Sequence, residues 1–295
     1  MKKINSSVAQ LLKGIWSQNY KGLSFTYTLT VIENICELLY AAVLGLAIDG
    51  LLEGRPASLV PIATLWIIHL FVGLFRHVYD TKVFIGIYSH IAVDMVERQR
   101  AGGVEGNKIV GRTSLSREIV DFFQIEVPAI ATASIRFIGA ITMLFIYDPF
   151  VGIFGLSAMI PIVIINRWFA QRAYRLNSAL NDRLEVEPDI IAHQPLAIVR
   201  RHFVRLRFWR VSISNAEATT WGGVEIVVIV LTLATLLRLT NIQGISVGTI
   251  YAIISYIWMF KDAVGDLPVI VDNLSRVHDI GERVAEEVIP VNSEQ

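Results

Sequence analysis

The feature that most constrains the fold is a series of six long apolar segments, each of about 20 residues or more. A helix needs roughly 20 mostly apolar residues to cross the 30 Å hydrocarbon core of a bilayer. The segments are Leu23–Leu51, Leu59–Val78, Val127–Tyr147, Val151–Phe169, Trp221–Leu239 and Ile245–Val264. They predict an all-α integral membrane protein with six transmembrane helices.

Composition supports a membrane protein and argues against several other classes. Hydrophobic residues make up 54% of the 295 residues and charged residues 18%, whereas a soluble domain carries about 25% charged residues. The formal net charge is zero, so we expect no nucleic-acid partner. The single cysteine, Cys36, lies in an apolar run. It offers neither a disulfide framework nor a metal-ligand spacing, and we expect no cofactor and no metal.

The first 21 residues predict a helix that lies on the membrane surface. The opening "MKKINSS" leads into no continuous apolar core, which argues against a signal peptide. Apolar residues then recur at helical spacing, with lysines nearby: Val8, Leu11, Leu12, Ile15 and Trp16, with Lys13 and Lys21. We therefore expect a surface helix over 1–21, a transmembrane domain over 22–284 and a short cytoplasmic tail over 285–295.

Basic residues predict the orientation of the chain. Lysines and arginines gather at the N-terminus, after the second apolar segment and after the fourth. The other three connections hold only Arg55 and Arg238. Because Lys and Arg near the ends of spans favour the cytoplasmic side, we expect both termini in the cytoplasm and three short outer loops. The expected location is the inner (plasma) membrane of a bacterium.

Long uninterrupted stretches predict helices that continue beyond the bilayer. Forty residues of helix extend about 60 Å, roughly twice the hydrocarbon thickness. Leu59–Arg98, Val151–Glu187 and Leu196–Leu239 are all near this length. We expect them to bundle in the cytosol, with tight turns near Gly102–Gly111 and Pro188–Pro195.

Three short motifs, in this order, resemble the transmembrane domain of type-1 (type IV fold) ATP-binding-cassette exporters. "LSREIVD" (Leu115–Asp121) is similar to the start of the third exporter helix, and "SVGTIYAIISY" (Ser246–Tyr256) to the start of the sixth. "DNLSRVHDIGERV" (Asp272–Val284) is similar to the helix that leads into the nucleotide-binding domain. The resemblance implies the exporter fold over nearly the whole chain. It also implies a homodimer with twelve membrane helices.

The chain departs from that family where the ATPase domain would follow. Only 12 residues follow Arg283, and the sequence holds no G-x-x-x-x-G-K-[ST] phosphate loop. We therefore expect no enzymatic activity from this chain, and a separate nucleotide-binding ATPase subunit as a possible partner. The first inner loop is short and glycine-rich, so docking of such a partner is doubtful there. The second inner turn retains its length, and its docking candidates are Glu187, Asp189, His193 and Gln194.

Seven ionisable residues fall in or near the apolar segments, where charge is costly and usually faces protein or water. They are the candidates for lining a polar cavity or pore: Glu33, Glu37, His69, Arg76, Arg136, Glu225 and Lys261. In a second interpretation they form ion pairs that hold helices together, for example Glu37 or Glu225 with Arg136. The sequence leaves both interpretations open.

Two functions fit these features, with a non-transporting membrane scaffold behind them. The first is an exporter subunit that moves a small solute through a cavity at the dimer axis, with ATP hydrolysed by a separate partner. The second is an ATP-independent ion channel or ion-coupled transporter on the same fold, which the intramembrane charges and His69 favour. In both cases the expected surroundings are a lipid bilayer and a small solute or ion.

Overall fold

The computed structural model describes residues 2–103, 117 and 120–265, apart from the side chains of residues 2–12 and of residue 98. Every regular element within these ranges is helical. Six helical stretches are long and apolar enough to cross a membrane. They are Lys13–Leu52, Pro56–Ala101, Phe122–Tyr147, Pro149–His193, Leu196–Thr240 and Val247–Gly265. The predicted all-α class and the six membrane helices are therefore confirmed.

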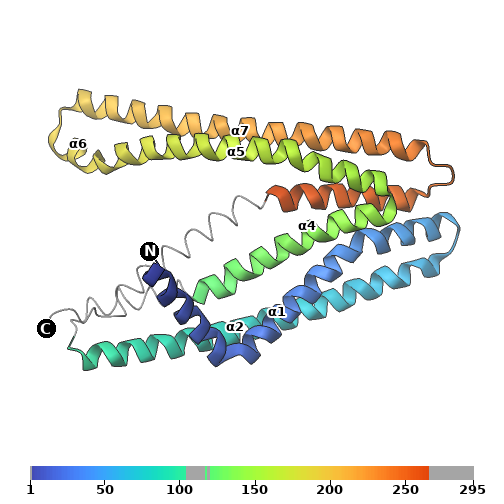
Figure 1. Ribbon diagram of the computed structural model, residues 1–295, viewed down its shortest axis with the longest axis horizontal. Coiled ribbons are helices and arrows are strands. Elements are labelled where there is room, and N and C mark those ends of the chain that lie inside the picture. Colours follow the sequence, from blue (N-terminus) through green and yellow to red (C-terminus); the bar gives the residue numbers. More distant parts are fainter. Residues whose placement is uncertain (1, 104–116, 118–119, 266–295) are drawn as a thin grey trace. The chain divides into compact units, whose positions relative to one another are not determined.

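The described residues divide into two compact units, made of 1–142 with 246–295 and of 143–245. The first unit contains α1 (Lys2–Leu52), the short helix η1 (Pro56–Ser58) and α2 (Leu59–Ala101). It also contains the π-helical turn η2 (Phe122–Glu126), most of α4 (Val127–Tyr147) and the Val247–Gly265 helix. Helices α1 and α2 lie side by side as a hairpin (Figure 1). Their connection turns at Gly54, whose φ of 76° favours glycine.

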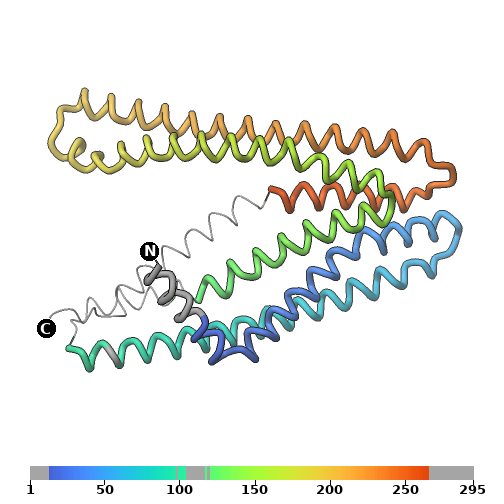
Figure 2. Tube along the Cα trace, in the orientation of Figure 1, coloured from blue at the N-terminus to red at the C-terminus, as the bar shows by residue number. Residues whose placement is uncertain are grey.

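Helix α1 joins the predicted surface helix to the first span in one element with a kink. Asn19 lies inside the helix with φ −118° and ψ 16°, and the trace changes direction in this region (Figure 2). Its side-chain amide donates to the carbonyl of Ile15 at 3.1 Å. An asparagine that bonds its own helix offers the backbone an alternative to the regular ladder. The change of direction therefore falls at Asn19, two residues before the expected boundary.

The inner part of the first unit has its own hydrophobic core. Buried side chains of α1, α2 and the start of the third span gather there: Ile15, Leu23, Phe84, Ile87, Val120 and Phe123. Beside this core, the Tyr27 hydroxyl donates to the carbonyl of Phe123 in η2 at 2.9 Å. A π-helical turn widens the helix and leaves carbonyls free to accept such bonds. This contact fixes the start of α4 against α1.

The outer end of α1 meets the Val247–Gly265 helix at a glycine–glycine crossing. A Cβ atom on Gly45 would lie 2.5 Å from the carbonyl oxygen of Gly248. One turn further along α1, the Asp49 carboxylate accepts bonds from the Gly248 amide at 2.7 Å and from the Ser246 hydroxyl at 2.6 Å. Asp49 therefore caps a helix that lies about 200 residues away in the sequence.

The second unit is a long helical hairpin. Helix α5 (Pro149–Glu185) and helix α7 (Leu196–Thr240) run side by side, and α6 (Glu187–His193) closes their far end (Figure 1). The predicted long helices and the turn near Pro188–Pro195 are confirmed. The other predicted turn, Gly102–Gly111, falls mostly outside the described residues.

Candidate functional site

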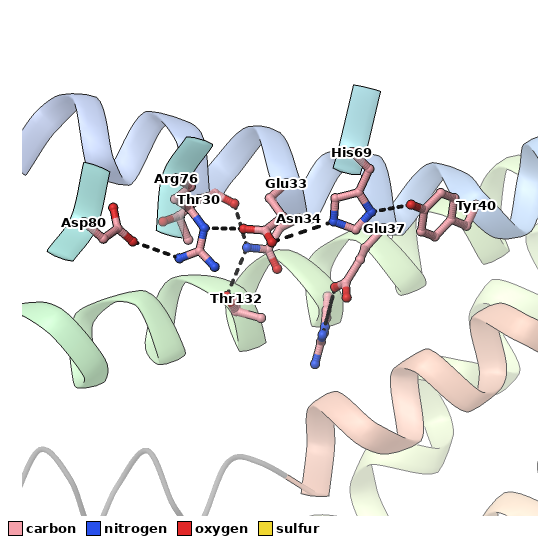
Figure 3. Close-up of polar contacts among 10 residues, drawn as sticks. Thr30, Glu33, Asn34, Glu37, Tyr40, His69, Arg76, Asp80 and Thr132 are labelled. Atoms are coloured by element: carbon pink, nitrogen blue, oxygen red, sulfur yellow. Dashed lines mark hydrogen bonds and ion pairs between the residues drawn. The ribbon is translucent and has the colours of Figure 1, made fainter. Parts of the chain in front are cut away.

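The charged residues of α1, α2 and α4 come together within the first unit. By helical rise, Glu37, His69 and Arg136 lie roughly 15–22 Å from the outer ends of their helices. That depth is near the middle of a hydrocarbon core about 30 Å thick. The residues that meet in this region are here called the polar cluster: Glu33, Glu37, Tyr40, His69, Arg76, Asp80 and Arg136 (Figure 3).

Glu33 on α1 is the centre of the cluster because two side chains of α2 reach it. The Arg76 guanidinium forms an ion pair with Glu33 through Nε. On its other side, Arg76 contacts Asp80 at 3.2 Å, one turn along α2. His69 Nε2 lies 3.8 Å from the second oxygen of Glu33. The predicted stripe of His69 and Arg76 thus faces one carboxylate on the neighbouring helix.

His69 is held from both sides. Its Nδ1 atom makes a hydrogen bond with the Tyr40 hydroxyl on α1, while Nε2 faces Glu33 (Figure 3). Glu33 and Tyr40 are seven residues apart, which is two helical turns, so both fall on the face of α1 that packs on α2. The imidazole therefore bridges a carboxylate and a phenol at membrane depth.

Glu37 turns to a different partner, although it lies only one turn from Glu33. Arg136 on α4 donates to Glu37 Oε2 through Nη2 at 2.8 Å and through Nε at 3.2 Å. This is one of the two pairings that the sequence left open. The two side chains are 32% and 34% exposed, so the described residues do not enclose the pair.

A second contact between α1 and α4 is uncharged, and the sequence analysis did not single it out. The buried Asn34 amide donates to Thr132 Oγ1 at 3.0 Å and to the carbonyl of Thr30 at 2.7 Å (Figure 3). Side-chain amides and hydroxyls hydrogen-bond between helices in membranes, where water is absent. Asparagine in the middle of an apolar segment was the signal that could have identified this contact.

The cluster carries unequal numbers of acidic and basic groups. Its carboxylates are Glu33, Glu37 and Asp80, and its guanidinium groups are those of Arg76 and Arg136. With a neutral His69 the formal charge is therefore −1, and a proton on His69 brings it to zero. Because an uncompensated charge at membrane depth is costly, the arrangement favours binding of a cation or a proton.

The two remaining cavity candidates lie apart from these contacts. Lys261, on the Val247–Gly265 helix of the first unit, places its ammonium 4.8 Å from the ring centroid of Trp258. Glu225 is a half-buried residue of α7 in the second unit. The structure therefore brings together five of the seven candidates: Glu33, Glu37, His69, Arg76 and Arg136.

The docking candidates lie on or next to α6, at the end of the hairpin between α5 and α7. Glu187 contacts His202 of α7 at 3.0 Å, and the His202 side chain is only 2% exposed. Asp189 and His193 pair with each other at 3.0 Å on the open side, where both are about three-quarters exposed. Gln194 ends the helix in extended conformation and is exposed. One side of α6 is thus anchored and the other is free for contact.

Charged residues at the outer helix ends were also not singled out. In addition to Asp49, Asp148 caps α5 by accepting the amides of Phe150 and Val151 at 2.8 and 3.1 Å. Asp148 also pairs with Arg238 of α7 at 3.2 Å. An Asp directly before a Pro at the start of an apolar run is a recognised start signal for a helix, and Asp148–Pro149 fits it.

Comparison with known proteins identifies the family. No curated protein matches the sequence. The family described as "ABC transporter transmembrane region" matches residues 12–248, well over half of the chain. The match includes the surface-helix residues from 12 onward, five of the six spans and the start of the last. The chain therefore belongs to the ABC transporter transmembrane region family and is an integral membrane protein with the transmembrane fold of a type-1 ABC exporter.

Proposed function

We propose that the chain forms the membrane pathway of an ABC-type exporter and moves a small solute or ion through a polar cavity that it builds with a second copy of itself. The family establishes membrane transport of the ABC exporter type. The observation that carries the finer proposal is the polar cluster at membrane depth.

Partial exposure of the cluster supports a cavity. Glu37 and Arg136 are each about one-third exposed, and Glu33 and Arg76 about one-quarter. Exposure of such groups to lipid is costly, so ionisable residues in membranes face protein or water. One chain supplies six membrane helices, and closed two-fold assemblies are the commonest oligomers. A homodimer in which the clusters face a shared water-filled space satisfies both conditions.

In this proposal the motor is a separate nucleotide-binding ATPase that contacts α6. The anchored side of α6, at Glu187 and His202, transmits movement to α7, while Asp189 and His193 remain available to the partner. The described chain contributes no phosphate loop of its own. The basic inner connections place both termini and α6 in the cytoplasm of a bacterial cell.

A second function is favoured by one observation, the excess negative charge of the polar cluster. A cavity with a net carboxylate and a histidine can bind a cation or a proton without ATP. The alternative is therefore an ATP-independent channel or ion-coupled transporter on the same fold.

Flux measurements on the purified chain distinguish the two functions. The chain is reconstituted in liposomes with K⁺, Na⁺ or proton gradients and without ATP, and the Glu37→Gln variant is the test of the cluster. His90→Gln is the matched control, because His90 is an exposed residue of α2. Flux without ATP that falls in Glu37→Gln and persists in His90→Gln supports the ion-coupled function.

A complementary purification tests the ATPase partner. Absence of flux, together with a stoichiometric ATPase that co-purifies with the chain and is lost in an Asp189→Ala, His193→Ala double variant, supports the exporter. If both assays give equal signals for all variants, the cluster and α6 have no part in transport and the proposal is wrong.

A further inference from the structure

We propose that His69 is a proton-binding site and that its proton neutralises the polar cluster. The inference rests on the proposed transport function only where it concerns transport; proton binding itself follows from the contacts of one chain. Its basis is the formal charge of −1 in the cluster when His69 is neutral, and the place of the imidazole between two partners.

The contacts of His69 suit the protonated ring. A neutral imidazole carries one N–H, and a protonated imidazole carries two. Nδ1 already makes a hydrogen bond with Tyr40, whose oxygen can accept from Nδ1–H or donate to bare Nδ1. Nε2 faces a Glu33 oxygen at 3.8 Å. A carboxylate accepts only, so a proton on Nε2 turns this approach into an attractive ion pair. In the protonated state both ring N–H groups face an oxygen.

The other charged groups near His69 leave the count unchanged. Arg76, on the same helix, pairs with Glu33 and Asp80, and Arg136 of α4 pairs with Glu37. The Val247–Gly265 helix packs on α1 through the Tyr256 hydroxyl, which donates to Leu38, and it carries Lys261 and Asp262, one of each sign. Among the described residues near the cluster, one negative charge remains to be neutralised.

One further residue of α2 competes for the same proton. His77 lies one turn before Thr81 on an exposed part of the helix and is close enough to act on the Asp80 carboxylate. His77 has no tyrosine partner comparable to Tyr40 among the printed contacts of the described residues. The geometry therefore assigns the proton to His69, and His77 is the variant that must be compared with it.

Proton binding changes the partners available to Glu33. With a neutral His69, Arg76 is the one cation that neutralises Glu33, and Arg76 is shared with Asp80. When the proton arrives from the aqueous phase, the imidazolium becomes a second cation for Glu33, and Arg76 is free to pair with Asp80 alone. Both Arg76 and Asp80 lie on α2, so the proton redistributes the ion pairs between α1 and α2. Histidine is the side chain whose charge ordinarily changes between about pH 5 and 8, so pH controls the contact.

The first test measures proton binding without transport. The full chain is labelled with ¹⁵N-histidine, reconstituted in nanodiscs and titrated between about pH 5 and 8, while ring nitrogen shifts report protonation. We expect a titrating signal at membrane depth that is lost in His69→Gln and retained in His77→Gln and His90→Gln. A signal that survives in His69→Gln, or a His69 ring that does not change over this range, overturns the inference.

Two substitutions test the reason for the proton as well as its position. Glu33→Gln removes the excess carboxylate, so the proton is no longer needed and the His69 titration is expected to shift by about one pH unit or more towards acid. Tyr40→Phe leaves the charge count as it is and is expected to change the shift far less. Equal effects of the two variants contradict the charge argument. Because each variant is observed through His69 itself, a variant that fails to fold is recognised by the loss of the other histidine signals.

Transport is the second readout and can fail separately. If the chain transports, flux in liposomes is expected to depend on pH in the wild type and in His90→Gln, and to vary by no more than about twofold over the same range in His69→Gln. Proton binding without any flux leaves the inference standing and contradicts the proposed function. Flux whose pH dependence is unchanged in His69→Gln overturns the inference and leaves the function standing.

Discussion

Substitution of Gly248 by alanine is the sharpest test of the packing of the first unit. A Cβ atom on Gly248 would lie 1.9 Å from the carbonyl oxygen of Gly45 and 2.6 Å from Asp49 Oδ2. Ordinary van der Waals contact begins at about 3.4 Å. The obstacle on the Gly45 side is backbone, which has no rotamer to change. The two helices must therefore separate by about 1.5 Å, the difference between these two distances.

The separation also breaks the cap at the start of the Val247–Gly265 helix. The Asp49 carboxylate lies 2.7 Å from the Gly248 amide, and a displacement of 1.5 Å puts it beyond hydrogen-bond distance. Overpacking costs roughly 1–3 kcal/mol, and a hydrogen bond to a charged group contributes about 1.5–3 kcal/mol. We expect a loss of about 3 kcal/mol in the free energy of unfolding, which is a fall of roughly 6–12 °C in Tm.

The single cysteine supplies the assay. Cys36 is buried, so a thiol-reactive fluorescent dye reports unfolding when heating exposes it. The control is Gly86→Ala on α2, where a new Cβ meets nothing within 4 Å. The control is expected to be neutral or to stabilise by up to about 1 kcal/mol, because alanine is the better helix former. If Gly248→Ala unfolds within about 2 °C of the wild type, the two helices do not cross at these glycines and the reasoning is refuted.

Three further substitutions test the ion pairs and caps. Arg136→Ala leaves Glu37 without its partner and is expected to lower the free energy of unfolding by roughly 1–3 kcal/mol, less than for a fully buried pair; the Glu37→Gln, Arg136→Gln double variant should lose less than the two single variants together, and strict additivity in a thermal double-mutant cycle would rule out the pair. Asp148→Ala removes the cap of α5 and is expected to cost about 1–2 kcal/mol, whereas Asp148→Asn should recover part of the loss, and identical Tm values for both would show that the cap contributes nothing. His202→Ala removes the buried anchor of Glu187, so limited proteolysis is expected to cut the turn after α5 several-fold faster; an unchanged cleavage rate would mean that α6 is held by other contacts.

Much of the fold is predictable because membrane helices announce themselves through length and apolarity. The expected third span, Val127–Tyr147, coincides with α4, and the long cytosolic continuation of α7 was predicted to within a residue. These features depend on local composition and on the absence of helix breakers, which a single sequence displays directly. The kink at Asn19 depends on one side-chain hydrogen bond, and no composition rule places it.

The candidate site was predictable in its membership and less so in its pairing. Intramembrane charges are rare enough to be noticed one by one, which is how Glu33, Glu37 and Arg136 were found. Helical spacing suggested that Glu33 and Glu37 act together, because they lie one turn apart. They in fact face α2 and α4 respectively, since a turn of α-helix does not return exactly to the same face and long side chains amplify the difference. Which charge meets which depends on helix packing, and spacing within one helix does not contain it.

The cap that Asp49 provides also bears on how the chain is made. Its partners Ser246 and Gly248 follow 197 and 199 residues later. At a synthesis rate of about 5–20 residues per second, the carboxylate leaves the ribosome roughly 10–40 s before the helix that it caps. During that interval Asp49 stands at the outer end of α1 without those partners, and the first span lacks one of its neighbours. Arrival of the last span completes the cap, so this contact marks a chain whose membrane insertion has finished.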